Sequence, residues 1–233
     1  MTSCDRTEWT PFRPDVAVVA ALASGLGISR VTAQVLAARG ITSVEEAGRF
    51  LSPSLTRDWP QTAAVPGLTE AAARVAAAVR AGESIVMFGD FDLDGISAAA
   101  TAALGLRALG ADVTATVPHR FREGYGLTPA ANERLLAMRP DLVVTVDCGI
   151  SGGREVAWLI EHGIDVVVTD HHEASECVPE GVPVADPKLI PDGPELAGAG
   201  VALALVRAAG ELLGGRERWR ELTDLAMLGT VSD

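Results

Sequence analysis

The segment Ile-Val-Met-Phe-Gly-Asp-Phe-Asp-Leu-Asp-Gly-Ile-Ser, from Ile85 to Ser97, determines how we interpret the rest of the chain. Its first four residues are apolar and predict a buried β-strand. Three aspartates follow at alternate positions, and a glycine then allows the chain to turn into an alanine-rich helix. Carboxylates this close together repel one another and raise each other's pKa. Because bound cations would offset that repulsion, we expect part of a metal site here, formed by Asp90, Asp92 and Asp94.

The composition limits the class of protein. The 233 residues are enough for one large α/β domain and a small appendage. No apolar run approaches the ~18 residues of a membrane span, and the N-terminus has no signal pattern, so we expect a cytoplasmic protein without a membrane partner. The formal net charge of −12 argues against a protein that coats DNA through bulk positive charge. It does not exclude a nuclease, because metal ions and local arginines would provide positive charge at the substrate.

Two regions differ in their patterning. Residues 1–68 predict a polar arm and a small helical segment, with short helices at 15–23, 29–39 and 43–51. Residues 69–233 predict the main domain, in which apolar segments alternate with helical ones after a first helix at 69–81. This alternation predicts an α/β fold with a mostly parallel five-stranded sheet and helices on both faces. The strands are expected at 85–88, 113–117, 142–146, 164–169 and 182–185, and the helices at 96–109, 128–138, 153–162, 201–213 and 216–228.

Polar side chains follow each of the first four predicted strands. In open parallel sheets, ligands bind beyond the carboxyl ends of the strands, so residues that follow different strands are expected to meet. Carboxylates combined with imidazoles suit Mn²⁺, and also Mg²⁺, Fe²⁺ or Zn²⁺. Four or more carboxylates are too many for one ion, and two metals ~3.5–4 Å apart are a standard arrangement for phosphoester hydrolysis by an activated water. Besides the three aspartates, the residues concerned are Arg120 and Arg122, Asp147 as the simplest bridging ligand, and Asp170-His171-His172.

Other interpretations of these motifs remain open. Asp-x-Asp-x-Asp-Gly also opens a calcium-binding EF-hand, but the twelfth position counted from Asp90 holds Thr101 instead of a bidentate glutamate. Residues 91–95 are close to the opening motif of haloacid-dehalogenase phosphatases, but Ile96 stands where that motif continues with threonine. Any one aspartate after a strand can be only a turn or cap residue, and adjacent surface histidines are usually inert. The three cysteines are interpreted as reduced thiols, and Cys148 as a small buried residue.

Four segments, in this order along the chain, resemble the four motifs of the DHH phosphoesterases. They are Phe-Gly-Asp-Phe-Asp-Leu-Asp-Gly-Ile-Ser at 88–97, Val-Asp-Cys-Gly-Ile-Ser at 146–151, Thr-Asp-His-His-Glu at 169–173 and Gly-Thr-Val-Ser-Asp at 229–233. Within that superfamily the chain is similar to the bacterial exonucleases specific for single-stranded DNA. Segments 39–41, 50–53, 122–127 and 196–202 share this likeness, so it covers nearly the whole chain after residue ~35.

The resemblance implies roles for individual residues. Asp92 and Asp147 would hold one metal, and Asp94, Asp147, His171 and Asp233 the other, with Asp90 as a ligand or immediate neighbour. His172 would face the scissile phosphate with Asp170 orienting the histidines, and Arg120 and Arg122 would contact substrate. Asp147, Asp170 and His172 would then be the catalytic residues. The family implies two divalent ions, with Mn²⁺ preferred over Mg²⁺, and 5′–3′ removal of nucleotides from single-stranded DNA in repair and recombination.

The chain also departs from the resemblance. Asp186 stands where an asparagine before proline is expected. Related exonucleases carry a further domain after the fourth motif, so we expect a fragment with a complete metal site, half of its cleft missing and weak activity. Its partners would be single-stranded nucleic acid, the missing C-terminal domain and possible replication or repair proteins. Two alternatives stay open: a DHH hydrolase of short oligonucleotides or cyclic dinucleotides, and a non-catalytic replication-partner module.

Overall fold

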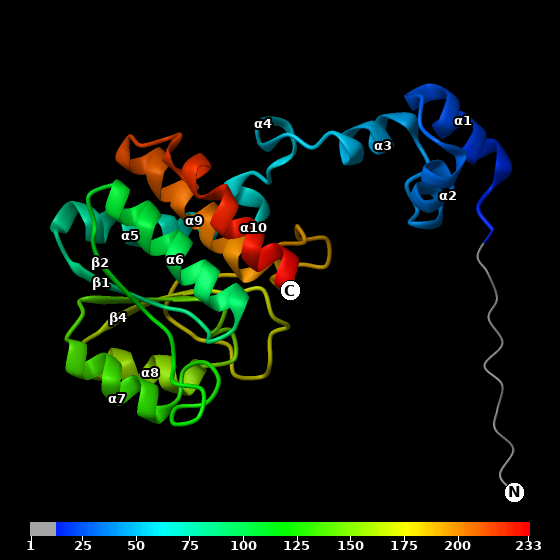
Figure 1. Cartoon of the computed structure of the whole chain (residues 1–233). Coiled ribbons are helices and arrows are strands. Elements are labelled where there is room, and N and C mark those ends of the chain that lie inside the picture. The colour runs from blue at the N-terminus through cyan, green and yellow to red at the C-terminus, as the bar shows by residue number, and fades with distance from the viewer. Residues whose placement is uncertain (1–12) are drawn as a thin grey trace, which may run out of the picture. The chain divides into compact units, whose positions relative to one another are not determined.

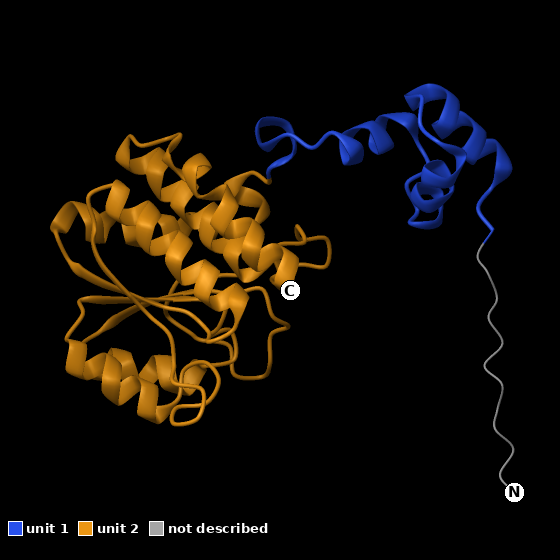
Figure 2. Cartoon of the chain, in the orientation of Figure 1, with its two compact units in different colours: residues 1–59 blue, residues 60–233 orange. Residues whose placement is uncertain are grey.

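The computed structural model describes residues 13–233, so most of the predicted N-terminal arm lies outside the described residues. Contacts divide the chain into two compact units, Met1–Trp59 and Pro60–Asp233 (Figure 2). The domain boundary expected between residues 68 and 69 stays a prediction. None of the helices in the described part of the chain is long and apolar enough to cross a bilayer.

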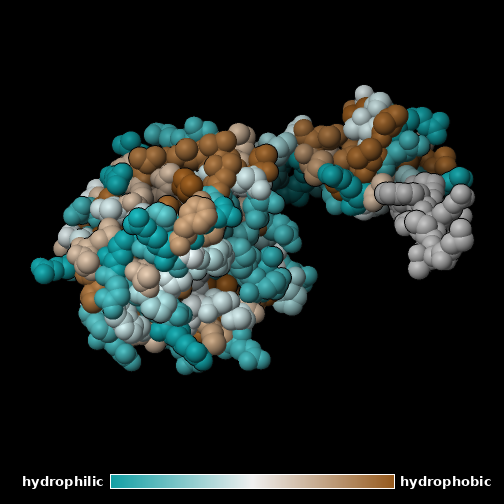
Figure 3. All heavy atoms as spheres, turned by 60° about the horizontal axis from the view of Figure 1, so that its bottom comes forward, coloured by the Kyte–Doolittle hydropathy of each residue, from teal (hydrophilic) through white to brown (hydrophobic). Residues whose placement is uncertain are grey.

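The first unit is helical, as its sequence pattern predicts. Its helices are α1 (Val16–Leu26), α2 (Arg30–Ala38), α3 (Val44–Leu51) and the short α4 (Leu55–Asp58). Side-chain oxygens of Asp15, Ser29 and Ser43 accept hydrogen bonds from backbone N–H groups in the first turns of α1, α2 and α3. A small apolar core lies between the first three helices and includes Val19, Leu22 and Leu36. Apolar residues also remain on the surface of this unit, which carries brown areas in Figure 3.

The second unit is built on a five-stranded parallel sheet with strand order β2-β1-β3-β4-β5. The strands are β1 (Ser84–Phe88), β2 (Asp112–Thr116), β3 (Leu142–Val146), β4 (Asp165–Thr169) and β5 (Val184–Ala185). All five residues of β3 are buried, as expected for a strand covered on both faces. The predicted fold class is therefore confirmed. The fifth strand is shorter than expected because Pro183 has no N–H group to continue the hydrogen-bond ladder.

Helices cover both faces of this sheet (Figure 1). On one face lie α5 (Leu68–Ala81), α6 (Leu93–Ala108) and α9 (Gly198–Leu213), with α10 (Thr223–Ser232) packed against α6 and α9. On the other face lie α7 (Pro129–Met138) and α8 (Gly153–Glu161), which share a core with β1, β3 and β4. Short 3-10 helices occur at η1 (Thr62–Ala64), η2 (Pro187–Leu189) and η3 (Arg218–Leu222).

Three of the helix boundaries that differ from the sequence prediction lie near the site. Helix α6 begins at Leu93 rather than residue 96 because the Asp92 carboxylate accepts a hydrogen bond from Gly95 N–H. Helix α9 begins at Gly198 rather than residue 201 because the Asp94 carboxylate accepts a hydrogen bond from Gly198 N–H. The helix predicted at 216–228 is two elements, η3 and α10, and α10 continues to Ser232. The terminal motif is therefore helical up to Ser232, and Asp233 follows the helix.

Candidate metal centre

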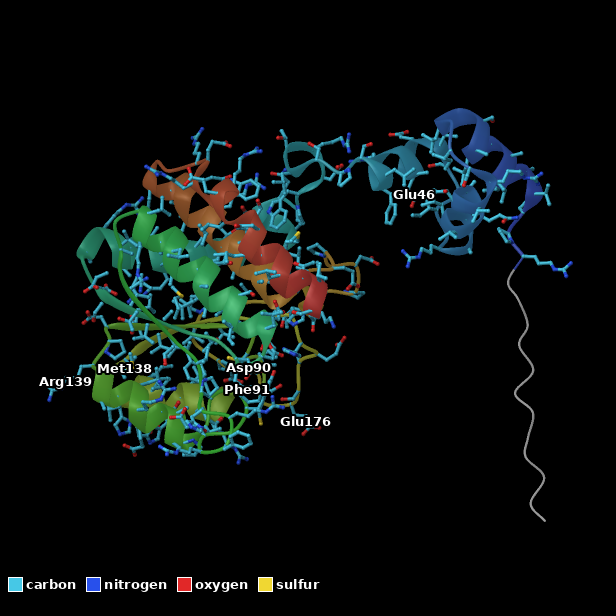
Figure 4. All side chains as sticks on the ribbon, viewed as in Figure 1. Glu46, Asp90, Phe91, Met138, Arg139 and Glu176 are labelled. Carbon is cyan, nitrogen blue, oxygen red and sulfur yellow. The ribbon has the colours of Figure 1, made fainter. Side chains whose placement is uncertain are left out.

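The candidate site lies at the carboxyl edge of the sheet. Strands β1, β3 and β4 are neighbours, so the residues that follow them are brought together, although they are far apart in sequence. Asp90 and Asp92 follow β1, Asp147 follows β3, and His171 and His172 follow β4 shortly after its end. In Figure 4, Asp90 lies at the end of the second unit opposite to Met138 and Arg139.

His171 is at the centre of the acidic cluster. Its Nε2 lies 3.1 Å from Asp147 Oδ1 and 3.6 Å from Asp94 Oδ2, and its Nδ1 lies 3.8 Å from Asp233 Oδ2. Asp90, Asp92 and Asp147 form a second group whose ligand atoms lie within 4.8 Å of one another. The structure thus brings together every residue predicted to bind metal: Asp90, Asp92, Asp94, Asp147, His171 and Asp233.

The chemistry of these residues fits divalent cations. Three buried atoms of this cluster make no hydrogen bond within the described residues: Asp90 Oδ1, and Asp147 Oδ1 and His171 Nε2, which lie 3.1 Å apart. A buried polar atom without a partner costs ~1–3 kcal/mol, so three of them in one cluster point to a missing partner. A cation would accept their lone pairs, and oxygen ligands with one imidazole suit Mn²⁺ or Mg²⁺.

Asp147 is held in an unusual conformation. Its φ of 62° is in the left-handed region, where residues other than glycine are uncommon. Its side chain is 2% exposed, and burial raises the pKa of the Asp147 carboxyl to about 7. Gly198 packs directly on it, because a Cβ atom at Gly198 would lie only 2.4 Å from Asp147 Oδ1. Such strain persists where the surrounding structure enforces it, commonly at functional sites.

Asp94 connects the metal centre to the helical layer. Its two carboxylate oxygens accept hydrogen bonds from Gly198 N–H (2.7 Å) and Ala199 N–H (2.9 Å) at the start of α9. The negative charge is favourable there because the helix N-terminus carries partial positive charge. Gly229 of α10 leaves room for this carboxylate, since a Cβ atom there would lie 2.3 Å from Asp94 Oδ1. Two glycines far apart in sequence therefore allow the helices to pack on two candidate ligands.

Asp170 orients His172 more directly than it orients His171. The Asp170 carboxylate accepts hydrogen bonds from His172 Nδ1 (2.7 Å) and from the backbone N–H groups of Ile150 (2.9 Å) and His171 (2.8 Å). Burial alone would raise the pKa of Asp170, but these hydrogen bonds hold it below its usual value. The hydrogen bond to Asp170 in turn raises the pKa of His172 to about 9. The His171 ring has no bond to Asp170; burial opposes its ionisation, but Asp147 raises its pKa.

The two predicted arginines lie on the loop between β2 and α7. The Arg120 guanidinium lies 4.8 Å from the centroid of the Phe91 ring, and Phe91 meets Tyr125 edge to face at 6.3 Å. Tyr125 Oη lies 3.5 Å from His172 Nε2, so a continuous series of contacts joins Arg120 to His172. The structure thus links Arg120 to the site through these contacts, and both Arg120 and Arg122 are exposed on this loop. Sequence reasoning missed Phe91 and Tyr125, although both are aromatic residues inside the quoted motif segments.

Two cavities border His172. The larger, about 640 Å³, is lined by His171, His172 and Asp233 together with Lys188, Glu173 and Thr230. The smaller, about 320 Å³, lies beside Tyr125 and Asp170 and is also lined by Ile150 and Ser151. His172 therefore lies between two spaces that can take parts of an extended substrate. Cys148 is buried and its pKa is raised by burial, which confirms its interpretation as a core residue.

The comparisons with known proteins agree with this geometry. Residues 84–230 match the family model described as the DHH family, N-terminal domain. The chain belongs to the DHH family. This assignment replaces the EF-hand and haloacid-dehalogenase interpretations of the first motif.

Similar proteins within this family are RecJ exonucleases. The chain is 46% identical to the single-stranded-DNA-specific exonuclease RecJ of Thermus thermophilus over 178 residues. This aligned region covers 75% of this chain and 26% of the relative. RecJ of Thermus thermophilus solved with Mn²⁺ superposes with a TM-score of 0.77 at 35% identity, over 95% of this chain and 31% of that one. The corresponding Mg²⁺ complex gives a TM-score of 0.66 at 32% identity, over 95% and 27%. The chain therefore spans about a quarter to a third of the length of these relatives.

Proposed function

We propose that this chain is the catalytic domain of a metal-dependent phosphodiesterase, a RecJ-like 5′–3′ exonuclease that acts on single-stranded DNA in repair and recombination. The observation that carries the proposal is the convergence of five carboxylates, three of them buried (Asp90, Asp94 and Asp147), and of His171 beside His172. The similar exonucleases are named for single-stranded DNA, and two of their solved structures hold Mn²⁺ or Mg²⁺. Their substrate and ions support the same assignment here.

Two overlapping ligand sets support a two-ion centre. Asp92 and Asp147 would hold one ion, with Asp90 beside them, and Asp94, Asp147, His171 and Asp233 would hold the other. When bound, the ions would supply an activated water and neutralise negative charge on the phosphate. The protein's part is to hold these ligands in a fixed arrangement, which the hydrogen bonds to Asp94 and the packing on Asp147 already do.

His172 and the arginines would bind the scissile region of the strand. The Asp170 carboxylate accepts a hydrogen bond from His172 Nδ1–H, so the other ring nitrogen, Nε2, is left to face the substrate space. An imidazolium in this position would donate a hydrogen bond to a phosphate oxygen, which strengthens as charge develops during hydrolysis. Arg120 and Arg122 would contact phosphates further along the strand. Phe91 and Tyr125 would keep Arg120 and His172 in a common arrangement.

The test is hydrolysis by the purified 233-residue chain. Single-stranded DNA labelled at either end, duplex DNA, a dinucleotide and a cyclic dinucleotide would be incubated with Mn²⁺, Mg²⁺ or Ca²⁺. We expect Mn²⁺-dependent mononucleotide release from the 5′ end of single-stranded DNA. The rate should fall about 10³-fold or more in Asp147→Ala, which removes a ligand of both proposed ions, and in His171→Ala, which removes the imidazole ligand of one of them. Asp112→Ala and His162→Ala should keep the wild-type rate. Asp112 is the first residue of β2 and His162 ends α8 shortly before β4, so both lie toward the amino ends of the strands, away from the candidate site.

Each other outcome selects a different function. Cleavage confined to the dinucleotide or cyclic dinucleotide would favour a small-substrate DHH hydrolase. Failure to bind Mn²⁺ in calorimetry, with no hydrolysis of any substrate, would favour a non-catalytic replication-partner module. Retention of the rate in Asp147→Ala would show that the proposed centre is not the active site.

A further inference from the structure

Lys188 is the only lysine in the sequence, and it lines the same cavity as His171, His172 and Asp233. The cavity is otherwise acidic at its rim, with Glu173 and Glu195 among its lining residues. A strand of nucleic acid that enters this cavity brings further negative charge. A cation is therefore needed on this side of the centre, and Lys188 is the basic residue in the lining of the cavity.

The backbone of Lys188 is held firmly. The buried Asp186 carboxylate accepts a hydrogen bond from Lys188 N–H (2.8 Å), and Asp186 N–H donates to Pro66 C=O (3.2 Å). Pro187 between them is buried. Asp170 N–H, next to the candidate histidines, donates to Ala185 C=O just before this turn (3.0 Å). The turn that carries Lys188 is thus bonded to the segment that carries the metal-binding histidine. Aspartate supplies the same side-chain acceptor here as the expected asparagine would.

The side chain of Lys188 is available for a ligand. Its ion pair with Glu173 is long, at 3.7 Å, and the two side chains are 40% and 83% exposed. Exposed pairs of this kind contribute little to stability and exchange readily for a better partner. A phosphate oxygen in the cavity would be such a partner.

Sheet order places Lys188 and Arg120 on opposite sides of the metal centre. Arg120 follows β2 at one edge of the sheet, Lys188 follows β5 at the other, and the metal-binding residues follow the strands between them. Strands lie ~4.8 Å apart, so the two edge strands are separated by roughly 19 Å, enough for several nucleotides. An extended strand that crosses the carboxyl edge therefore meets a cation on each side of the scissile phosphate.

We propose that Lys188 binds a backbone phosphate of the substrate strand on the side of the metal centre opposite to Arg120. This inference rests on the proposed function and adds a phosphate contact to it. The contact is electrostatic and independent of base identity, so Lys188 would set affinity for the strand without altering the chemical step.

The test compares Lys188→Gln, Lys188→Arg and the control Arg139→Gln. Arg139 is also a basic residue, but it ends α7 at the far end of the unit (Figure 4). With a single-stranded oligothymidylate and Mn²⁺, Lys188→Gln should raise KM at least threefold and leave kcat within twofold. The slope of log(kcat/KM) against log[salt] should become shallower by about 0.7, the value for one lost single-strand phosphate contact. Lys188→Arg and Arg139→Gln should match wild type.

The slope of log(kcat/KM) against log[salt] distinguishes a phosphate contact from a structural role of Lys188. Loss of a structural role would leave this slope unchanged. An unchanged KM and slope in Lys188→Gln, with an unchanged unfolding midpoint, would overturn the inference while leaving the proposed function intact. A fall in kcat with KM unchanged would also overturn it. Absence of cleavage by the wild-type chain would refute the proposed function itself, and the inference with it.

Discussion

The close packing of Gly198 on Asp147 makes a quantitative prediction. An alanine Cβ at position 198 would lie 2.4 Å from Asp147 Oδ1 and 2.5 Å from its Cβ, whereas ordinary contacts begin near 3.4 Å. The helix or the aspartate must therefore move by about 1 Å. Overpacking of this kind costs ~1–3 kcal/mol, and the better helix propensity of alanine returns ~0.5–1 kcal/mol at most. We expect Gly198→Ala to lose ~1–2 kcal/mol of unfolding free energy.

The assays are urea and thermal unfolding, both followed by circular dichroism, together with Mn²⁺ calorimetry. For a chain of this size, a loss of ~1–2 kcal/mol lowers Tm by about 2–8 °C. Because Asp147 belongs to both proposed ligand sets, its displacement should also weaken Mn²⁺ binding about tenfold or more. Gly200→Ala is the matched control: its Cβ would meet Leu196 at 3.4 Å, an ordinary contact, so its stability should be unchanged or slightly higher.

Equal stability and equal Mn²⁺ affinity in Gly198→Ala and Gly200→Ala would refute the reasoning. That result would mean that α9 does not position Asp147. A loss of stability without a loss of Mn²⁺ affinity would mean that the packing supports the fold but not the metal centre.

Burial raises the pKa of the Asp147 carboxyl from 3.8 to about 7 in the folded protein. Between about pH 4 and pH 7 the folded state therefore holds a proton that the unfolded chain releases, so the metal-free protein should lose stability as pH rises through this range. Thermal midpoints across this range should vary less in Asp147→Asn, and a wild-type midpoint independent of pH would contradict the assignment. Mn²⁺ should raise the midpoint more at pH 8 than at pH 6, since it competes with that proton; equal shifts at both pH values would argue against Asp147 as a ligand. Phe121 is 90% exposed beside Arg120, so Phe121→Ala should leave the unfolding midpoint unchanged but raise KM for single-stranded DNA about fivefold or more, because base stacking contributes ~1–3 kcal/mol. Phe121→Trp should keep the wild-type KM, and an unchanged KM in Phe121→Ala would exclude stacking there.

Local pattern was sufficient to predict most of the fold. Continuous apolar runs such as Ile85–Phe88 and Leu142–Val146 predict strands that are buried on both faces, and the helical segments between them require parallel crossover connections. Once the sheet is parallel, its strand ends meet at one edge. The convergence of Asp90, Asp147 and His171 was therefore predictable without coordinates.

The arrangement of individual atoms depended on tertiary packing. Asp94 caps α9 from 104 residues away, and nothing near Asp94 in the sequence indicates that partner. Whether Asp170 bonds the ring of His171 or of His172 also depended on the path of the backbone after β4.

The sequence by itself determined which residue types stand at the strand ends, and hence the class of chemistry, because strand and helix periodicity is a local property. Only the tertiary structure decided which carboxylate faces which imidazole, and that Gly198 and Gly229 admit the helices so close to the centre. These contacts join residues on different layers, and their distances depend on how whole helices pack rather than on any local pattern.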